Sequence, residues 1–198
     1  QSLFVWTWLP GDTTPVVAGR LIERSGRVDF VYGESYLRRD NAISLYRPEL
    51  PLGPGLIAPL PGLDLAGSIR DGSPDAWGRR VIDSRLGVGD VDLTELSYLV
   101  ASGSNRLGAL DFQTSPTRYV PRDETATLDE LHEAAIMVEE GRALPQPLAE
   151  ALIRGTSIGG ARPKALLADG DGTQWIAKFS SSSDTHFSVP KAEGATMI

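Results

Sequence analysis

The chain has 198 residues, of which 41% are hydrophobic, and it carries a formal net charge of −7 at pH 7. This length and apolar content suit one large or two small folded domains and exclude wholesale disorder. The acidic charge argues against direct nucleic-acid binding, and the lack of cysteine excludes disulfides and thiolate metal sites. His132 and His186 are too far apart in sequence to predict a zinc site. Because neither a signal peptide nor a membrane-spanning segment is visible, we expect a cytoplasmic protein.

The first part of the chain predicts short strands. Runs rich in β-branched and aromatic residues, separated by turns that contain Gly or Pro, occur at Leu3–Leu9, Val16–Glu23 and Val28–Tyr32. Because the links are short, we expect an antiparallel meander. A further strand is predicted at Ala42–Tyr46, and the Pro-rich stretch Glu49–Gly62 is expected to form a loop.

Helix signals follow these strands. Ser73-Pro74-Asp75 predicts a helix start in which Ser73 caps the backbone and Pro74 takes the first helical position. One face of this helix is expected to hold Trp77, Val81 and Ile82. Two further helix starts have the spacing of capping boxes: Asp92 with Glu95, and Thr127 with Glu130.

The polar stretch Ser115–Thr125, with its two prolines, is a candidate domain boundary. It follows a predicted strand at Leu107–Phe112 and precedes the helix that starts at Thr127. We therefore predict an α+β chain. Residues 1–122 would form an antiparallel β-sheet domain with helices, and residues 126–198 a second domain.

A glycine-containing loop followed by a β-hairpin is the most informative feature of the second domain. Gly155–Phe179 reads GTSIGGARPKALLADGDGTQWIAKF. The loop glycines let the backbone approach a ligand closely, and Gly170-Asp171-Gly172 predicts the turn between two strands. In the second strand, Ile176 and Lys178 share one face. Loop N–H groups, the Lys178 ammonium and the apolar surface of Ile176 together suit a nucleoside triphosphate.

Three other glycine-containing motifs bear on this loop. The loop matches neither the Walker pattern G-x-x-x-x-G-K-[ST] nor the dinucleotide pattern G-x-G-x-x-G. Gly155–Gly159 does fit G-x-S-x-G, the nucleophile elbow of serine hydrolases, and Asp184 and His186 follow in the hydrolase order. An elbow needs a strand before the serine and a helix after it, whereas here a helix precedes and Pro163 and a hairpin follow. A serine hydrolase is therefore a minor alternative.

The runs SIGGARPKALL and WIAKF resemble the signature of HipA-like toxins, which are serine/threonine kinases of bacterial type II toxin–antitoxin systems. The upstream runs DGSPDAWGRRVIDSRLG and GALDF resemble the N-terminal region of the same family. The resemblance covers nearly the whole chain. It implies a HipA N-terminal-like subdomain at 1–122 and, at 126–198, the helical entry and ATP side of a protein-kinase-like N-lobe.

The resemblance implies an ATP site. The residues expected to bind the nucleotide are Ser157, Ile158, Gly159, Gly160, Ala161, Lys164, Ile176 and Lys178. Ser157 matches the loop serine that some members autophosphorylate, and Glu193 falls where a helix glutamate would pair with Lys178. The family's catalytic loop and metal-binding aspartate have no counterpart after Lys178, so we expect neither catalytic nor metal-binding residues here. The magnesium ligands would lie in a missing lobe, and the chain would be a fragment or half of a split protein.

The resemblance also implies partners. These are a helix-turn-helix antitoxin of the HipB kind and a protein substrate such as one of the translation machinery. DNA would be contacted only through the antitoxin, and no membrane is involved. The alternative function is a non-catalytic module that binds the antitoxin or another partner.

Overall fold

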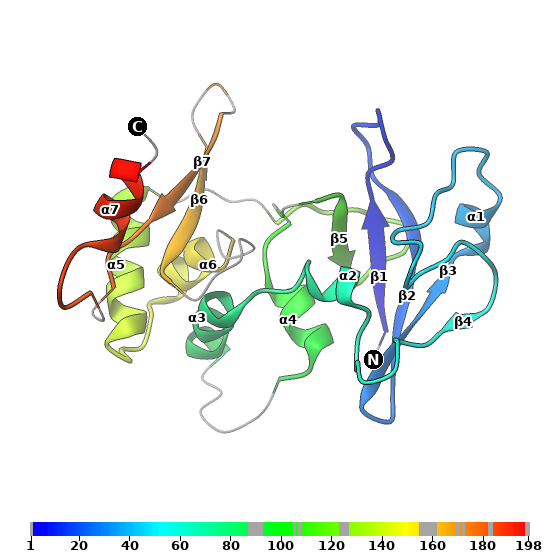
Figure 1. Cartoon of the computed structure of the whole chain (residues 1–198), viewed down its shortest axis with the longest axis horizontal. Coiled ribbons are helices and arrows are strands. Elements are labelled where there is room, and N and C mark those ends of the chain that lie inside the picture. The colour runs from blue at the N-terminus through cyan, green and yellow to red at the C-terminus, as the bar shows by residue number, and fades with distance from the viewer. Residues whose placement is uncertain are drawn as a thin grey trace. The chain divides into compact units, whose positions relative to one another are not determined.

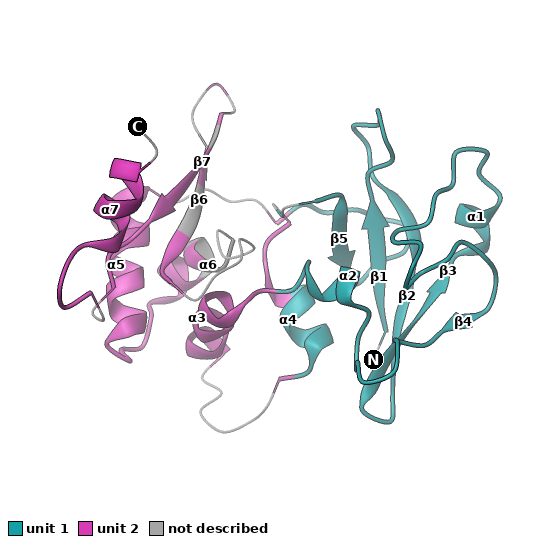
Figure 2. Cartoon of the chain, in the orientation of Figure 1, with its two compact units in different colours: residues 1–73, 94–100, 106–121 teal, residues 74–93, 101–105, 122–198 magenta. Residues whose placement is uncertain are grey.

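The computed structural model describes residues 2–86, 93–104, 106, 108–122, 127–154, 162–168, 171, 173–181 and 184–196. The chain forms two compact units, which Figure 2 shows in different colours. The N-terminal unit consists of residues 1–73, 94–100 and 106–121. The C-terminal unit consists of residues 74–93, 101–105 and 122–198. The chain therefore passes between the units several times, whereas the sequence predicts a single boundary between residues 122 and 126.

Within the described residues, the N-terminal unit is built on a five-stranded antiparallel sheet in the order β4-β3-β2-β1-β5 (Figure 1). Its strands are β1 (Ser2–Thr7), β2 (Val16–Arg24), β3 (Arg27–Tyr32), β4 (Leu56–Ile57) and β5 (Leu110–Gln113). The first three strands pair in sequence order, which confirms the predicted meander. The loop predicted at Glu49–Gly62 contains the two residues of β4 and an isolated bridge from Leu50 to Tyr46.

One face of this sheet carries the core of the unit. Its buried side chains include Leu3, Val5, Leu21, Phe30 and Phe112. The same cluster contains Ile69 of α2 (Gly67–Arg70) and Leu96 and Leu99 of α4 (Glu95–Ala101). Burial of these large apolar side chains is the main favourable term in folding this unit, at roughly 25 cal/mol for each Å² removed from water.

The strand predicted at Ala42–Tyr46 is wrong. The backbone of this segment bonds to two tyrosine hydroxyls instead of to a neighbouring strand. The N–H of Leu45 donates to the hydroxyl oxygen of Tyr32 at 2.9 Å, and the hydroxyl of Tyr36 in α1 (Glu34–Leu37) donates to the carbonyl oxygen of Ile43 at 2.9 Å. The two tyrosine rings stack with their centroids 5.7 Å apart. Side-chain hydroxyls thus satisfy backbone groups that a strand would have paired.

The described elements of the C-terminal unit are α3 (Ala76–Leu86), α5 (Leu128–Glu139), α6 (Gln146–Arg154), β6 (Lys164–Ala168), β7 (Gln174–Lys178) and α7 (Val189–Thr196) (Figure 1). Helix α6 packs against α3 and α5, and both α5 and α6 pack against β6. The two strands pair antiparallel, which confirms the predicted hairpin. The side chains predicted to share the buried face of α3 are buried: Trp77, Val81 and Ile82.

The capping box predicted for α5 is confirmed. The side chain of Thr127 accepts a hydrogen bond from the N–H of Glu130, and the Glu130 carboxylate accepts one from the N–H of Thr127 at 2.9 Å. This reciprocal arrangement satisfies two backbone donors that a helix start otherwise leaves unpaired. It therefore fixes the point at which the helix begins.

The cap predicted for α3 is wrong. The carboxylate of Asp75, not the hydroxyl of Ser73, accepts a hydrogen bond from the N–H of Trp77, at 3.1 Å. Ser73 is engaged elsewhere, because its hydroxyl donates to a carboxylate oxygen of Glu95 at 3.3 Å. The cap predicted for α4, Asp92, lies outside the described residues.

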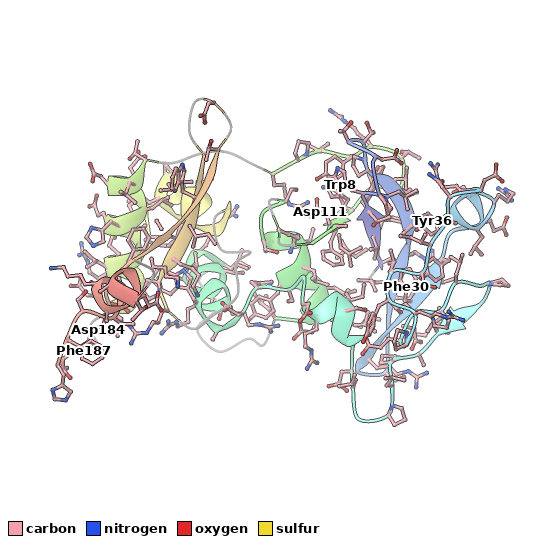
Figure 3. The ribbon with its side chains drawn as sticks, turned by 45° about the horizontal axis from the view of Figure 1, so that its top comes forward. Trp8, Phe30, Tyr36, Asp111, Asp184 and Phe187 are labelled. Atoms are coloured by element: carbon pink, nitrogen blue, oxygen red, sulfur yellow. The ribbon has the colours of Figure 1, made fainter. Side chains whose placement is uncertain are left out.

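A buried ion pair connects three segments of the N-terminal unit. Nε of Arg106 lies 3.0 Å from Oδ1 of Asp111, and the two side chains are 1% and 0% exposed. The same guanidinium donates to the carbonyl oxygens of Gly72 and Leu99. The second oxygen of Asp111, which Figure 3 labels, accepts from the side-chain amide of Gln113 at 2.8 Å. Both charges are therefore surrounded by hydrogen-bond partners, as a buried pair requires.

Replacing Arg106 with Met tests this ion pair. Met keeps most of the side-chain length but removes the guanidinium that Oδ1 of Asp111 contacts. We expect the free energy of unfolding to fall by about 3–5 kcal/mol, measured by urea denaturation. The control is Arg38→Met, which removes the exposed pair with Glu34 and should cost under about 1 kcal/mol. Equal losses in the two variants would contradict the role given to Arg106.

Candidate functional site

The hairpin β6–β7 places two lysines opposite each other. Lys164 pairs with Lys178 in the antiparallel register, and Leu166 pairs with Ile176. Because side chains two residues apart share a face of a strand, Lys164, Ile176 and Lys178 lie on the same face. The structure thus brings together three of the residues that the sequence singles out for nucleotide binding.

Lys178 is paired with a carboxylate from the following helix. Its Nζ lies 2.5 Å from Oε2 of Glu193 in α7. The two side chains are 50% and 42% exposed, so the pair stands at the surface. A strand lysine and a helix glutamate, fifteen residues apart in sequence, therefore form the ion pair that the family resemblance implies.

Lys164 lies in a different environment. It is only 5% exposed, and its Nζ has no hydrogen-bond partner among the described residues. Burial lowers the pKa of the Lys164 ammonium, because the charged form loses solvation, and the positive charge of Lys178 lowers it further. Asp75 and Glu193 act in the opposite direction. A buried ammonium with free donors is suited to receive an anionic ligand.

An apolar surface adjoins the two lysines. Ile176 is 49% exposed although it lies at the centre of β7. An exposed apolar side chain two residues from Lys178, next to the pair of lysines, can contact a flat, uncharged group while the lysines bind negative charge. Ser157, Ile158, Gly159, Gly160 and Ala161 lie outside the described residues.

The end of the glycine-containing loop is held by an ion pair that the sequence does not predict. Nη1 of Arg162 lies 2.5 Å from Oδ1 of Asp184, whose side chain is only 4% exposed. The other oxygen of Asp184 accepts from the N–H of Ser181 at 3.3 Å. Figure 3 labels Asp184 and the exposed Phe187 on the segment between β7 and α7. The arginine inside SIGGARPKALL was the available signal, but its partner lies 22 residues away.

The same contacts bear on the hydrolase alternative. In a catalytic triad the aspartate accepts a hydrogen bond from the histidine. Within the described residues, Asp184 accepts from Arg162 and Ser181, and the side chain of His186 is exposed. The third residue of that alternative, Ser157, lies outside the described residues.

The described part of the chain contains no group of three or more His, Asp or Glu side chains that could hold a metal ion. Among the helices described, none has the length and apolar character needed to cross a bilayer.

Comparison with known families identifies the N-terminal part of the chain. The HipA N-terminal domain family matches residues 13–113. The chain belongs to this family. No curated protein matches the chain. The part of this HipA-like chain that matches includes β2 to β5 and also α3, whereas the hairpin β6–β7 and α7 follow the match.

The contribution of the Arg162–Asp184 pair to the free energy of unfolding should depend on pH. The hydrogen bond from Arg162 lowers the pKa of Asp184 below its usual value. The stabilisation is therefore complete above the pKa of the unfolded chain, about 3.9, and is lost as the pH falls through the lower pKa of the folded state. We expect Asp184→Asn to be less stable than the wild type at pH 7, and the difference to vanish in acid, as measured by urea denaturation across pH.

A double-mutant cycle gives the control for this prediction. Arg162→Gln removes the same pair from its other side, so the two substitutions together should cost little more than either alone. Additive losses would show that the two side chains act independently.

Proposed function

We propose that this HipA-like chain carries the nucleotide-binding part of an ATP-dependent protein serine/threonine kinase, the toxin of a toxin–antitoxin module. The observation that carries the proposal is the ion pair between Lys178 and Glu193. Protein kinases use a strand lysine, held by a helix glutamate, to position the phosphates of ATP. In this proposal, β6, β7 and α7 are part of a kinase-like N-lobe.

The described residues of the hairpin suit the phosphates and the base of ATP. The ammonium of Lys178 would pair with phosphate oxygens, and Lys164 would add a second positive charge opposite it on β6. The half-exposed side chain of Ile176 would contact the base. The sequence places the glycine-containing loop directly before β6, so its N–H groups would cover the phosphates.

Magnesium would enter with the nucleotide and neutralise part of the triphosphate charge. The described residues contain no metal-binding group, so we propose no magnesium ligand among them. Their own contribution is to bind and orient the nucleotide. The aspartate that orients the substrate hydroxyl in kinases would belong to a further lobe.

Nucleotide binding is tested by replacing Lys178 with Met. We expect the affinity for ATP, measured by isothermal titration calorimetry with Mg²⁺ present, to fall about tenfold or more, because a charge-assisted hydrogen bond contributes about 1.5–3 kcal/mol. Lys191→Met is the matched control, since Lys191 is an exposed lysine on α7, and it should bind ATP as the wild type does. Equal affinities in the two variants would contradict the proposal.

Phosphorylation of Ser157 would regulate the same site. A phosphate adds about two negative charges at pH 7 to a loop that is proposed to hold phosphate. We expect Ser157→Asp to weaken ATP binding through charge repulsion, and the loss to shrink at high salt. Ser157→Asn has nearly the same shape without the charge, and should bind more tightly than the aspartate variant. Unchanged ATP affinity in Ser157→Asp would refute this regulation.

A partner-binding role is the second candidate. The segment between α1 and α2 leaves large apolar side chains exposed, among them Ile43, Tyr46, Leu52, Leu56 and Leu60. Exposed apolar side chains gathered in one segment favour contact with another protein. The partner proposed is a helix-turn-helix antitoxin, with DNA contacted only through it, and a protein substrate would bind separately. If Lys178→Met and the wild type both fail to bind ATP, this function is the one that stands.

A further inference from the structure

The start of α3 contacts the first residue of β6 through a buried hydrogen bond. The indole N–H of Trp77 donates to the carbonyl oxygen of Lys164 at 3.2 Å. Trp77 is fully buried and Lys164 nearly so. The bond joins residues 87 positions apart, so the position of the Lys164 backbone depends on the N-terminal end of α3.

Asp75 lies immediately before this helix, and only one of its two carboxylate oxygens caps the helix. Its Oδ1 caps α3 by accepting from the N–H groups of Trp77 and Gly78, at 3.1 and 3.4 Å. Its Oδ2 is buried and has no hydrogen-bond partner among the described residues. A buried carboxylate oxygen without a partner is costly unless a positive charge lies near it.

The Trp77 bond holds Lys164 beside this end of α3, and the Lys164 ammonium is a buried positive charge that also has no hydrogen-bond partner among the described residues. Burial and Lys178 lower the pKa of Lys164, and Asp75 and Glu193 raise it, Asp75 ahead of Glu193. Glu193 already contacts Lys178 directly. Helices α5 and α6 also pack against β6. The charged residues of α5 are not among the groups that shift this pKa: Asp129, Glu130, His132, Glu133 and Glu139. The charged side chains of α6, Glu150 and Arg154, lie outside the described part of the chain.

We propose that Asp75 is the counter-charge of Lys164, a positioning residue through which the start of α3 keeps a buried ammonium charged for an anionic ligand. The identity of this ligand, the phosphate chain of a nucleotide, rests on the proposed function. The pairing of Asp75 with Lys164 does not rest on it. Each lysine of the hairpin face then has a carboxylate of its own, Glu193 for Lys178 and Asp75 for Lys164.

The composition of the chain makes the pairing directly measurable. The only lysines in the sequence are Lys164, Lys178 and Lys191. Lysine labelled with ¹³C and ¹⁵N therefore gives three side-chain NMR signals, which Lys178→Arg and Lys191→Arg assign. In Asp75→Asn, which keeps the cap because Asn also caps helices well, we expect the Lys164 signal to titrate at lower pH than in the wild type.

Controls and a second readout separate the pairing from the ligand. Asp129→Asn makes the same substitution in the first turn of α5 and should leave the Lys164 titration unchanged. Asp75→Ser, a second neutral cap, replaces Asp75→Asn if that variant does not fold. An unchanged Lys164 titration in the folded variant overturns the proposal, whether or not the chain binds ATP.

ATP affinity as a function of pH then tests the ligand. As the pH rises, we expect Asp75→Asn to lose ATP affinity at a lower pH than the wild type does, because Lys164 is deprotonated earlier. Lys164→Arg in the Asp75→Asn background should remove this pH dependence, because arginine stays charged. A shifted Lys164 titration without any effect on ATP binding would keep Asp75 as the counter-charge and overturn the nucleotide as its purpose.

Discussion

A buried charge in a folded protein needs a compensating charge close by, and on the hairpin face of the C-terminal unit this constraint applies to Lys164. Lys178 is half exposed and contacts Glu193 of α7 directly. Lys164 is buried, and the carboxylate that acts on it most strongly is Asp75, ahead of α3. Because desolvation disfavours an isolated ammonium so strongly, β6 depends on the start of α3 for a counter-charge as well as for the hydrogen bond from Trp77. The two lysines of the candidate site therefore depend on carboxylates from two other segments, Glu193 in α7 and Asp75 before α3.

Local patterns in the sequence predict the features whose cause is local. The meander β1–β3, the capping box at Thr127 and the hairpin β6–β7 each depend on residues within one turn or one strand pair. The shared face of Ile176 and Lys178 follows from the period of a strand. The structure also brings Glu193 to Lys178, where family resemblance suggested it.

Features with a distant cause could not be predicted in this way. The residues of Ala42–Tyr46 do not themselves indicate that their backbone groups will bond to tyrosine hydroxyls of β3 and α1. Ser73 has the right chemistry for a cap, but Glu95 engages it and Asp75 caps α3 in its place. The ion pair of Arg162 with Asp184 and the bond from Trp77 to Lys164 likewise join segments that only the fold brings together.

The passage of the chain between the two units limits how it can be divided. The family match ends at residue 113, yet α3, inside that match, packs with α6 in the C-terminal unit. A piece cut after residue 122 would carry α3 away from α6 and expose the face formed by Trp77, Val81 and Ile82 to water. Such a piece would have an exposed apolar patch and would tend to aggregate. The segments before and after residue 122 are therefore best produced together.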